Sequence, residues 1–123
     1  MATLADRVFD NGLSVLDLEA NKILITSQEA ATYTEANATY ALGNSTSLSI
    51  AAPSDRTGGG REVVVAAISD GSVTGNGVAT HYAIVDTVNS RLLATGGLTT
   101  SQTVTTGNTF SLGSFTIGIP DPV

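Results

Sequence analysis

The sequence predicts an all-β protein, an antiparallel β-sandwich of the jelly-roll or immunoglobulin-like type that follows a short N-terminal helical arm. Three observations predict this fold. About seven or eight short segments are rich in β-branched or alternating apolar residues, and turn signals separate them at intervals of roughly eight to twelve residues. Only residues 1–20 place apolar side chains near helical spacing. We therefore expect an arm over residues 1–20 and a single sandwich domain over residues 21–123.

The arm has an amphipathic pattern with one interruption. Asn11-Gly12 falls inside the pattern and predicts a break between a short helix and a second helical turn. Apolar spacing does not identify the surface on which such an arm docks, so its own domain and a neighbouring subunit both stay open. We expect the arm to act in assembly rather than in the core of the monomer. Its apolar positions are Leu4, Val8, Leu16 and Leu18.

The first half of the sandwich contains three predicted strands. Residues 22–26 form a short β-branched run, residues 45–52 alternate with Leu48 and Ile50 on one face, and residues 61–69 are apolar on both faces, as in a central strand. The polar, alanine-rich residues 27–41 predict a loop with one helical turn.

The second half is predicted from its turns. The dipeptides Asp70-Gly71, Asn76-Gly77 and Gly107-Asn108 are typical of hairpin turns. Residues 78–86 and 91–98 form a hairpin around residues 87–90, Gly113 marks a bulge, and Pro120 ends a strand over residues 115–119. The predicted core contains Val64, Ile68, Tyr82, Ile84, Leu92, Phe110, Phe115 and Ile117.

Composition excludes several classes of protein. The 123 residues contain no cysteine, which rules out disulfides and thiolate metal sites. A net charge of −6 with five Lys and Arg argues against nucleic-acid binding. The N-terminal residues do not form the apolar segment of a signal peptide, and no apolar run has the length of a membrane span, so we expect synthesis in the cytoplasm.

The surface is expected to be polar but weakly charged. Charged residues make up 13% of the chain, about half the usual share, and Ser, Thr, Asn, Gly and Ala replace them. This composition suits a protein that packs against neighbours, because interfaces are depleted in Lys and Glu. A soluble β-domain without a special partner has the same composition, so both readings stay open.

His81, the only histidine, is followed by Asp86 and suggests a catalytic dyad. Five residues of extended strand separate the two side chains by about 17 Å and place them on opposite faces. They cannot pair directly, and a histidine without a partner lacks the tuning that catalysis requires. We expect His81 to be a structural or surface residue.

Three other motifs carry little chemistry. The segment RTGGGRE, residues 56–62, lacks the Lys-Ser/Thr ending of a phosphate loop and predicts a mobile turn, whose Arg56 and Arg61 could grip a neighbour's carboxylate. The segment DGSVTGNG lacks the spaced acids of a calcium loop. The sequons at Asn37 and Asn44 have no meaning without secretion. We expect no catalytic residue, cofactor or metal site, and a protein that is not an enzyme.

Five segments together resemble small structural proteins encoded by tailed bacteriophages and prophages. They are LADRVFDNGLSVL, YTEANATYALGN, APSDRTGGGREVVVAAISDGSVT, ATHYAIVDTVNSRLLATGGL and VTTGNTFSLGSFTIGIPDP, and they span nearly the whole chain. The resemblance implies a virion component. It carries over no functional residues, because the shared motifs are structural.

Two classes of function follow as expectations. The first is a capsid decoration protein on the outer surface of the virion, or otherwise a head–tail or tail accessory subunit, with the major capsid protein and copies of itself, as a homo-oligomer such as a trimer, as partners. The second is a fibre module that binds host glycans, for which Tyr33 and Tyr40 could supply stacking rings. The residues expected at the assembly interface are Leu4, Val8, Phe9, Arg56, Arg61, Pro120 and Pro122.

Overall fold

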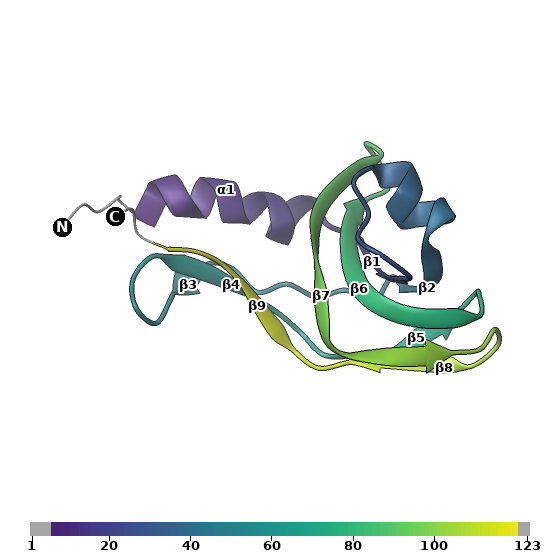
Figure 1. Cartoon of the computed structure of the whole chain (residues 1–123). Coiled ribbons are helices and arrows are strands. Elements are labelled where there is room, and N and C mark those ends of the chain that lie inside the picture. The colour runs from purple at the N-terminus through teal and green to yellow at the C-terminus, as the bar shows by residue number, and fades with distance from the viewer. Residues whose placement is uncertain (1–5, 121–123) are drawn as a thin grey trace. The chain divides into compact units, whose positions relative to one another are not determined.

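The computed structural model describes residues 6–120, with side chains described from Asp10 onward. It confirms an all-β, sandwich-like antiparallel fold with a short N-terminal helix (Figure 1). The residues group into two compact units, and the grouping does not follow the expected division at residue 20. Of the described residues, one unit comprises residues 6–19, 49–67 and 113–120, and the other comprises residues 20–48 and 68–112. We call them the three-stranded unit and the six-stranded unit, after their sheets.

The six-stranded unit is one strongly curled antiparallel sheet in the order β7-β6-β1-β2-β5-β8. Its β1 is central and carries Ile23, Leu24 and Ile25, all buried. Both faces of β1 are covered, because the sheet curls around one and the segment before β2 covers the other. The elements are β1 (Lys22–Thr26), the π-helix η1 (Glu35–Thr39), β2 (Ala41–Ser45), β5 (Ile68–Val73), β6 (Gly77–Asp86), β7 (Arg91–Val104) and β8 (Thr109–Leu112).

A small cluster joins η1 to the sheet. Leu24 lies directly opposite Ala83 in the β1–β6 register, and both pack with Ala36 of η1. The small alanine side chains let the π-helix approach the strands closely, and the larger Leu24 fills the space between them. The cluster contains Leu24, Ala30, Ala36, Ala83 and Val85, with Tyr33, Tyr40, Ala41 and Leu92 packed against it.

Two glycines of this sheet make room for aromatic rings. Gly71 lies opposite Phe110, and any β-carbon at Gly71 would overlap the ring. Gly96 lies opposite Tyr82, whose ring would be 2.6 Å from a β-carbon at Gly96. The ring therefore covers the backbone that the glycine exposes, an arrangement that pins strand register.

The three-stranded unit places the helix α1 (Asp6–Glu19) against an antiparallel sheet of order β3-β4-β9, made of β3 (Ser54–Asp55), β4 (Arg61–Val65) and β9 (Phe115–Ile119). Val63 and Val65 of the central β4 are fully buried and pair with Ile117 and Phe115 of β9. Leu13 and Leu16 of the helix are also buried.

The helix runs through Asn11-Gly12 without the predicted break. A glycine inside a helix costs about 1 kcal/mol relative to alanine. Burial of a leucine side chain contributes about 1.5–3 kcal/mol, so Leu13 and Leu16 outweigh that cost. The expectation that the arm lies outside the monomer's core was wrong for these two residues.

Several strands end elsewhere than predicted. The predicted strand over residues 45–52 is replaced by β2, which ends at Ser45, and by a single bridge at Ile50. The predicted strand over residues 61–69 is two strands in two sheets, β4 and the start of β5, because the chain passes between the units there. Gly113 belongs to the connection between β8 and β9, not to a bulge.

The predicted turns are confirmed in part. The turn over residues 87–90 joins β6 and β7, and Gly107-Asn108 joins β7 and β8. The dipeptide Asp70-Gly71 is not a turn but lies within β5. Gly71 leaves room for the ring of Phe110 and does not have a positive φ. The bounds predicted for β1 and β9 are confirmed.

The predicted core is also only partly confirmed. Ile68, Ile84 and Phe110 are buried, whereas Val64 is 38% exposed on the outer face of its sheet. Tyr82, Leu92, Phe115 and Ile117 are half-buried. The prediction was wrong for Val64, because Val63 and Val65 form the inner face of β4. For the half-buried residues, the sequence pattern does not show how far another element covers their face of the strand.

Candidate functional site

His81 is half-buried on β6 and contacts its sequence neighbour. Its Nδ1 lies 2.8 Å from Thr80 Oγ1, and that hydroxyl donates to the Ser27 carbonyl oxygen at 3.0 Å. Because the hydroxyl hydrogen is used by Ser27, the arrangement is satisfied when Nδ1 carries the proton and donates to Thr80. The Thr80 hydroxyl therefore links β6 to the chain after β1, and the ring of His81 supports that hydroxyl.

Asp86 organises the turn that follows β6. The residue is 2% exposed, and its carboxylate accepts hydrogen bonds from Val88 N at 2.9 Å, Asn89 N at 3.4 Å and Asn89 Nδ2 at 2.8 Å. The bond from the Asn89 side chain is the main cause that lowers the pKa of Asp86, the backbone donors and Arg91 lower it further, and burial opposes them. The carboxylate stabilises the turn in its ionised form.

Asn21 holds the same turn from the start of β1. Its Oδ1 accepts from Thr87 N at 3.1 Å, and its Nδ2 donates to Thr87 Oγ1 at 2.9 Å. With Asp86, this pair satisfies the backbone donors of three successive turn residues. Asp86 and His81 have different partners and different roles. This agrees with the argument that the two do not form a dyad.

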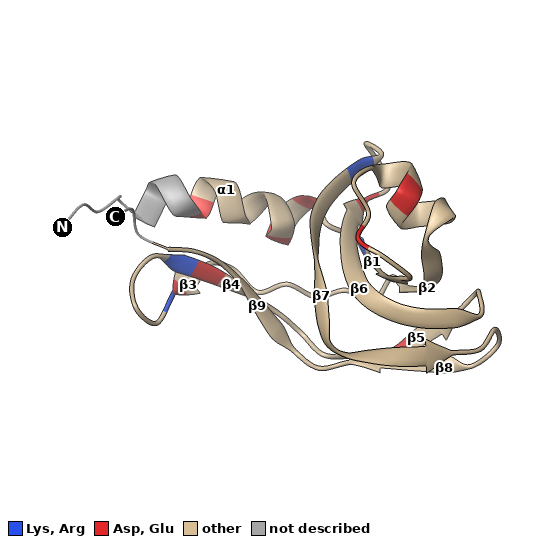
Figure 2. Cartoon of the chain, viewed as in Figure 1, with Lys and Arg blue, Asp and Glu red and all other residues tan. Residues whose placement is uncertain are grey.

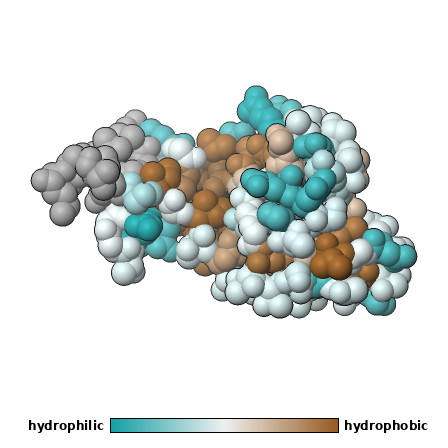
Figure 3. All heavy atoms as spheres, in the orientation of Figure 1, coloured by the Kyte–Doolittle hydropathy of each residue, from teal (hydrophilic) through white to brown (hydrophobic). Residues whose placement is uncertain are grey.

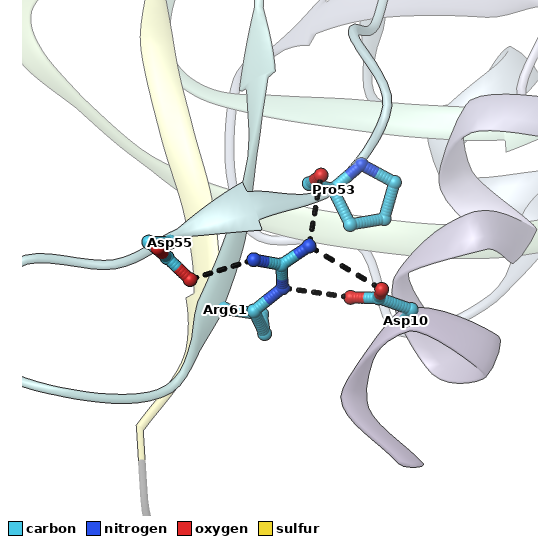
Figure 4. A network of polar contacts seen from close by, with 4 residues as sticks. All are labelled: Asp10, Pro53, Asp55 and Arg61. Carbon is cyan, nitrogen blue, oxygen red and sulfur yellow. Dashed lines mark hydrogen bonds and ion pairs between the residues drawn. The ribbon is translucent and has the colours of Figure 1, made fainter. Parts of the chain in front are cut away.

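Arg61 forms the most extensive polar network of the three-stranded unit (Figure 4). Its Nε and Nη2 donate to the two carboxylate oxygens of Asp10 at 3.0 and 3.4 Å, Nη1 donates to Asp55 at 2.6 Å, and Nη2 also reaches the Pro53 carbonyl oxygen at 3.3 Å. The Arg61 side chain is 16% exposed. The guanidinium thus joins α1, β3 and β4 of one chain, where we expected it to reach a neighbour.

Arg56 closes the glycine-rich loop. Its Nη1 donates to the Gly59 carbonyl oxygen at 3.0 Å, and its side chain lies over Gly118 of β9. Gly58, Gly59 and Gly60 all have φ near +90° to +107°, a region that favours glycine. The three glycines therefore form a tight strand connection, and no helix follows whose N-terminus could hold a phosphate.

The other expected interface residues are described only in part. Pro120 is exposed directly after β9. Leu4 and Pro122 lie outside the described residues, and the side chains of Val8 and Phe9 lie outside them too. Their assignment to an interface stays a prediction.

Sequence reasoning missed the partners of these groups. Asp10 and Arg61 are 51 residues apart, and Asn21 and Thr87 are 66 apart, so no local spacing connects them. Glu35 was missed as well, although it stabilises η1. Its carboxylate accepts from Ala31 N at 2.8 Å and from Tyr40 Oη at 3.2 Å.

The polar side chains of the described region bind backbone groups and other side chains of the same chain. Among residues 6–120, no group of three His, Asp or Glu side chains lies close enough to hold a metal ion. The described helices include none that is long and apolar enough to cross a membrane. The comparisons with family models, curated proteins and solved structures found no match.

Proposed function

We propose that the chain is a structural protein of a tailed-bacteriophage virion, a decoration protein that covers the outer surface of the capsid and stabilises the head shell. The resemblance of its sequence segments to phage structural proteins supplies the class of particle. The second support is the exposed surface of the long strand β7, which carries little charge.

The strand β7 offers a broad polar surface with little charge. Of its 14 residues only Arg91 is charged, and the exposed ones after it are threonine, serine and glycine (Figure 2). In the pairing with β6, residues 98–101 are skipped and bulge from the ladder. Short hydroxyl side chains lose little conformational entropy on packing, and they need no charged partner. Such a surface suits many weak contacts that repeat over a symmetric shell.

The hydropathy and the net charge of the chain also bear on the proposal. Figure 3 shows a face on which pale residues of intermediate hydropathy surround patches of hydrophobic residues, and strongly hydrophilic residues form small groups. The net charge of −6 favours the outer side of the shell, because packaged DNA repels an acidic protein without a basic stripe.

The described polar groups support a role without catalysis. Arg61, Asp86 and His81 each bind other parts of the same chain. Glycan binding has less support, because Tyr33 and Tyr40 pack against the η1 cluster and Tyr40 donates to Glu35. Rings held in this way offer less of their faces to a sugar.

The proposal is tested with particles that lack the chain. We expect their heads to release DNA at a lower temperature, or after milder osmotic shock, than complete particles, and purified protein to restore resistance when added back. Quantitative mass spectrometry should give hundreds of copies per virion, and antibodies should label the head. Equal DNA release with and without the chain, or label confined to the tail, would replace the decoration role by a tail accessory role.

A further inference from the structure

The chain contains two Asn-Gly dipeptides, and the structure places them in different backbone settings. Asn11-Gly12 lies inside the helix α1, whereas Asn76-Gly77 ends the connection between β5 and β6. The side chains of Asn11 and Asn76 are both exposed. In an Asn-Gly pair the backbone nitrogen of the glycine can attack the side-chain amide of the asparagine, because no β-carbon blocks the approach. The two sites differ mainly in what their backbone allows that nitrogen to do.

The backbone nitrogen of Gly77 lies outside the ladders of β6. The Val85 carbonyl oxygen accepts from Asn21 N at 3.1 Å, directly before β1, so the backbone groups of Val85 face β1. In an antiparallel sheet, residues that bond to one neighbouring strand alternate with residues that bond to the other. Gly77 is eight residues before Val85 on the same strand, so its N–H also faces away from β7. β1 pairs with residues 81–85 of β6 and therefore ends before it reaches Gly77.

The corresponding nitrogen of Gly12 is held by its helix. Gly12 is the seventh residue of α1, beyond the first turn, so its N–H bonds to the carbonyl oxygen four residues earlier. Attack by this nitrogen requires the helix to open beside Leu13 and Leu16, whose side chains are buried. The fold therefore protects Asn11 although its side chain is exposed.

A hydrogen-bond donor also lies on the reacting group of Asn76. Its Oδ1 accepts from Thr106 N at 2.8 Å. When a nitrogen adds to Cγ, this oxygen becomes an oxyanion, and a donor already in place stabilises the developing charge. The donor is fixed by a tight turn, in which Asn108 N donates to the Thr105 carbonyl oxygen at 3.1 Å and Gly107 has a φ of 92°.

We propose that Asn76 is a site of spontaneous deamidation, in which the Gly77 nitrogen attacks Asn76 Cγ and the Thr106 N–H stabilises the oxyanion. The Gly77 nitrogen loses its proton, and the Cγ–Nδ2 bond breaks to release ammonia and leave a succinimide ring. Water then adds to either ring carbonyl and gives aspartate or isoaspartate, without an oxidant or reductant.

The reaction changes the connection between β5 and β6 in two ways. Either product adds one negative charge at an exposed position, and isoaspartate also adds a methylene group to the backbone directly before β6. Older chains thereby become chemically distinct from newly made ones. The inference goes beyond the proposed function and does not depend on it.

Peptide mapping of the purified full-length chain after incubation in mildly alkaline buffer tests the site. Trypsin separates the two asparagines into residues 8–22 and residues 62–91, and fragmentation in the mass spectrometer locates the conversion. We expect Asn76 to convert at least about tenfold faster than Asn11, a difference in barrier of about 1.4 kcal/mol. The product should contain both aspartate and isoaspartate. Equal rates at the two sites in the folded chain, or aspartate alone, would overturn the proposal.

The same measurement in urea separates the fold from the local sequence. Without the helix, Asn11 should convert at a rate similar to that of Asn76. If Asn11 stays as slow in urea as in the folded chain, helix protection is not the cause of the difference, and the structural argument is wrong.

Two variants of Thr106 test the oxyanion donor. Thr106→Pro removes the N–H, and proline is common at this position of a turn whose next residue has a positive φ. Thr106→Ala is the matched control, because it removes the side chain and keeps the N–H. We expect deamidation of Asn76 to slow several-fold in Thr106→Pro and to stay at the wild-type rate in Thr106→Ala. Equal rates in the two variants would overturn the role of Thr106, and the comparison with Asn11 applies even if Thr106→Pro does not fold.

Discussion

The two units differ in how completely they bury the strand that lies beside the central strand. In the six-stranded unit, β1 and the adjoining end of β6 are buried on both faces. In the three-stranded unit, only the inner face of β4 is fully buried, and β9 beside it is half-buried. In the first unit, strands and η1 cover the central strand. In the second unit, one helix packs on the sheet, and the guanidinium of Arg61 joins that helix to β3 and β4. We therefore expect truncation of a core side chain to cost more stability in the first unit than in the second.

The largest expected effect is a loss of stability in the six-stranded unit, which is the better buried of the two. Ile84 is fully buried on β6, so Ile84→Ala should lower the free energy of unfolding by about 2–5 kcal/mol. Phe115→Ala removes a larger side chain from the half-buried β9 and should nevertheless cost less. Urea denaturation followed by circular dichroism measures both losses. A greater loss for Phe115→Ala would mean that the comparison of burial between the units is misleading.

The second effect concerns the polar network of the three-stranded unit. Arg61→Ala removes the donors to Asp10, Asp55 and Pro53 and should cost about 1–3 kcal/mol, as expected for hydrogen bonds to charged groups. Hydrogen exchange should show faster exchange at the amides of β4 and α1 and little change in β1.

Arg56→Ala is the matched control, because it removes the same charge and a single hydrogen bond to Gly59. Arg61→Lys should restore only part of the stability, since one ammonium group cannot reach all three acceptors of the planar guanidinium. Equal protection of β4 in Arg61→Ala and Arg56→Ala would show that the network contributes little.

The pH dependence of stability tests one contribution within the six-stranded unit, that of Asp86. The pKa of Asp86 is lower in the folded chain than in the unfolded one, because Asn89 donates to its ionised carboxylate. Its contribution to stability is therefore fully present above the unfolded pKa and is lost as pH falls through the folded pKa. Thermal unfolding of wild type and Asp86→Ala should show a difference near neutral pH that shrinks in acid. A difference that is constant with pH would contradict this origin.

The smallest expected effect is that of His81→Gln. Glutamine can keep a polar contact near Thr80, so stability should change by no more than about 0.5 kcal/mol, and incorporation into particles should not change. Thermal unfolding and the copy number per particle measure these quantities. Loss of infectivity with normal folding and incorporation would point to a role in chemistry that the contacts of His81 do not indicate.

Local patterns predicted the elements whose causes are local. The β-branched run of β1, the turn before β7 and the proline after β9 each depend on a few adjacent residues. The continuous helix, the strand position of Gly71 and the partners of Arg61 depend on residues far away in the sequence, namely a buried core, Phe110 and Asp10. No spacing rule connects such pairs, so the sequence alone could not predict the network or the division into two units.

The three-stranded unit combines segments from three distant parts of the chain, and this affects when it can form during synthesis. All strands of the six-stranded unit precede residue 113, so that sheet can form before β9 leaves the ribosome. The helix α1 is made first but acquires the last strand of its sheet only when β9 emerges. Contacts of such long sequence separation form slowly. The three-stranded sheet is therefore completed only after β9 has been synthesised.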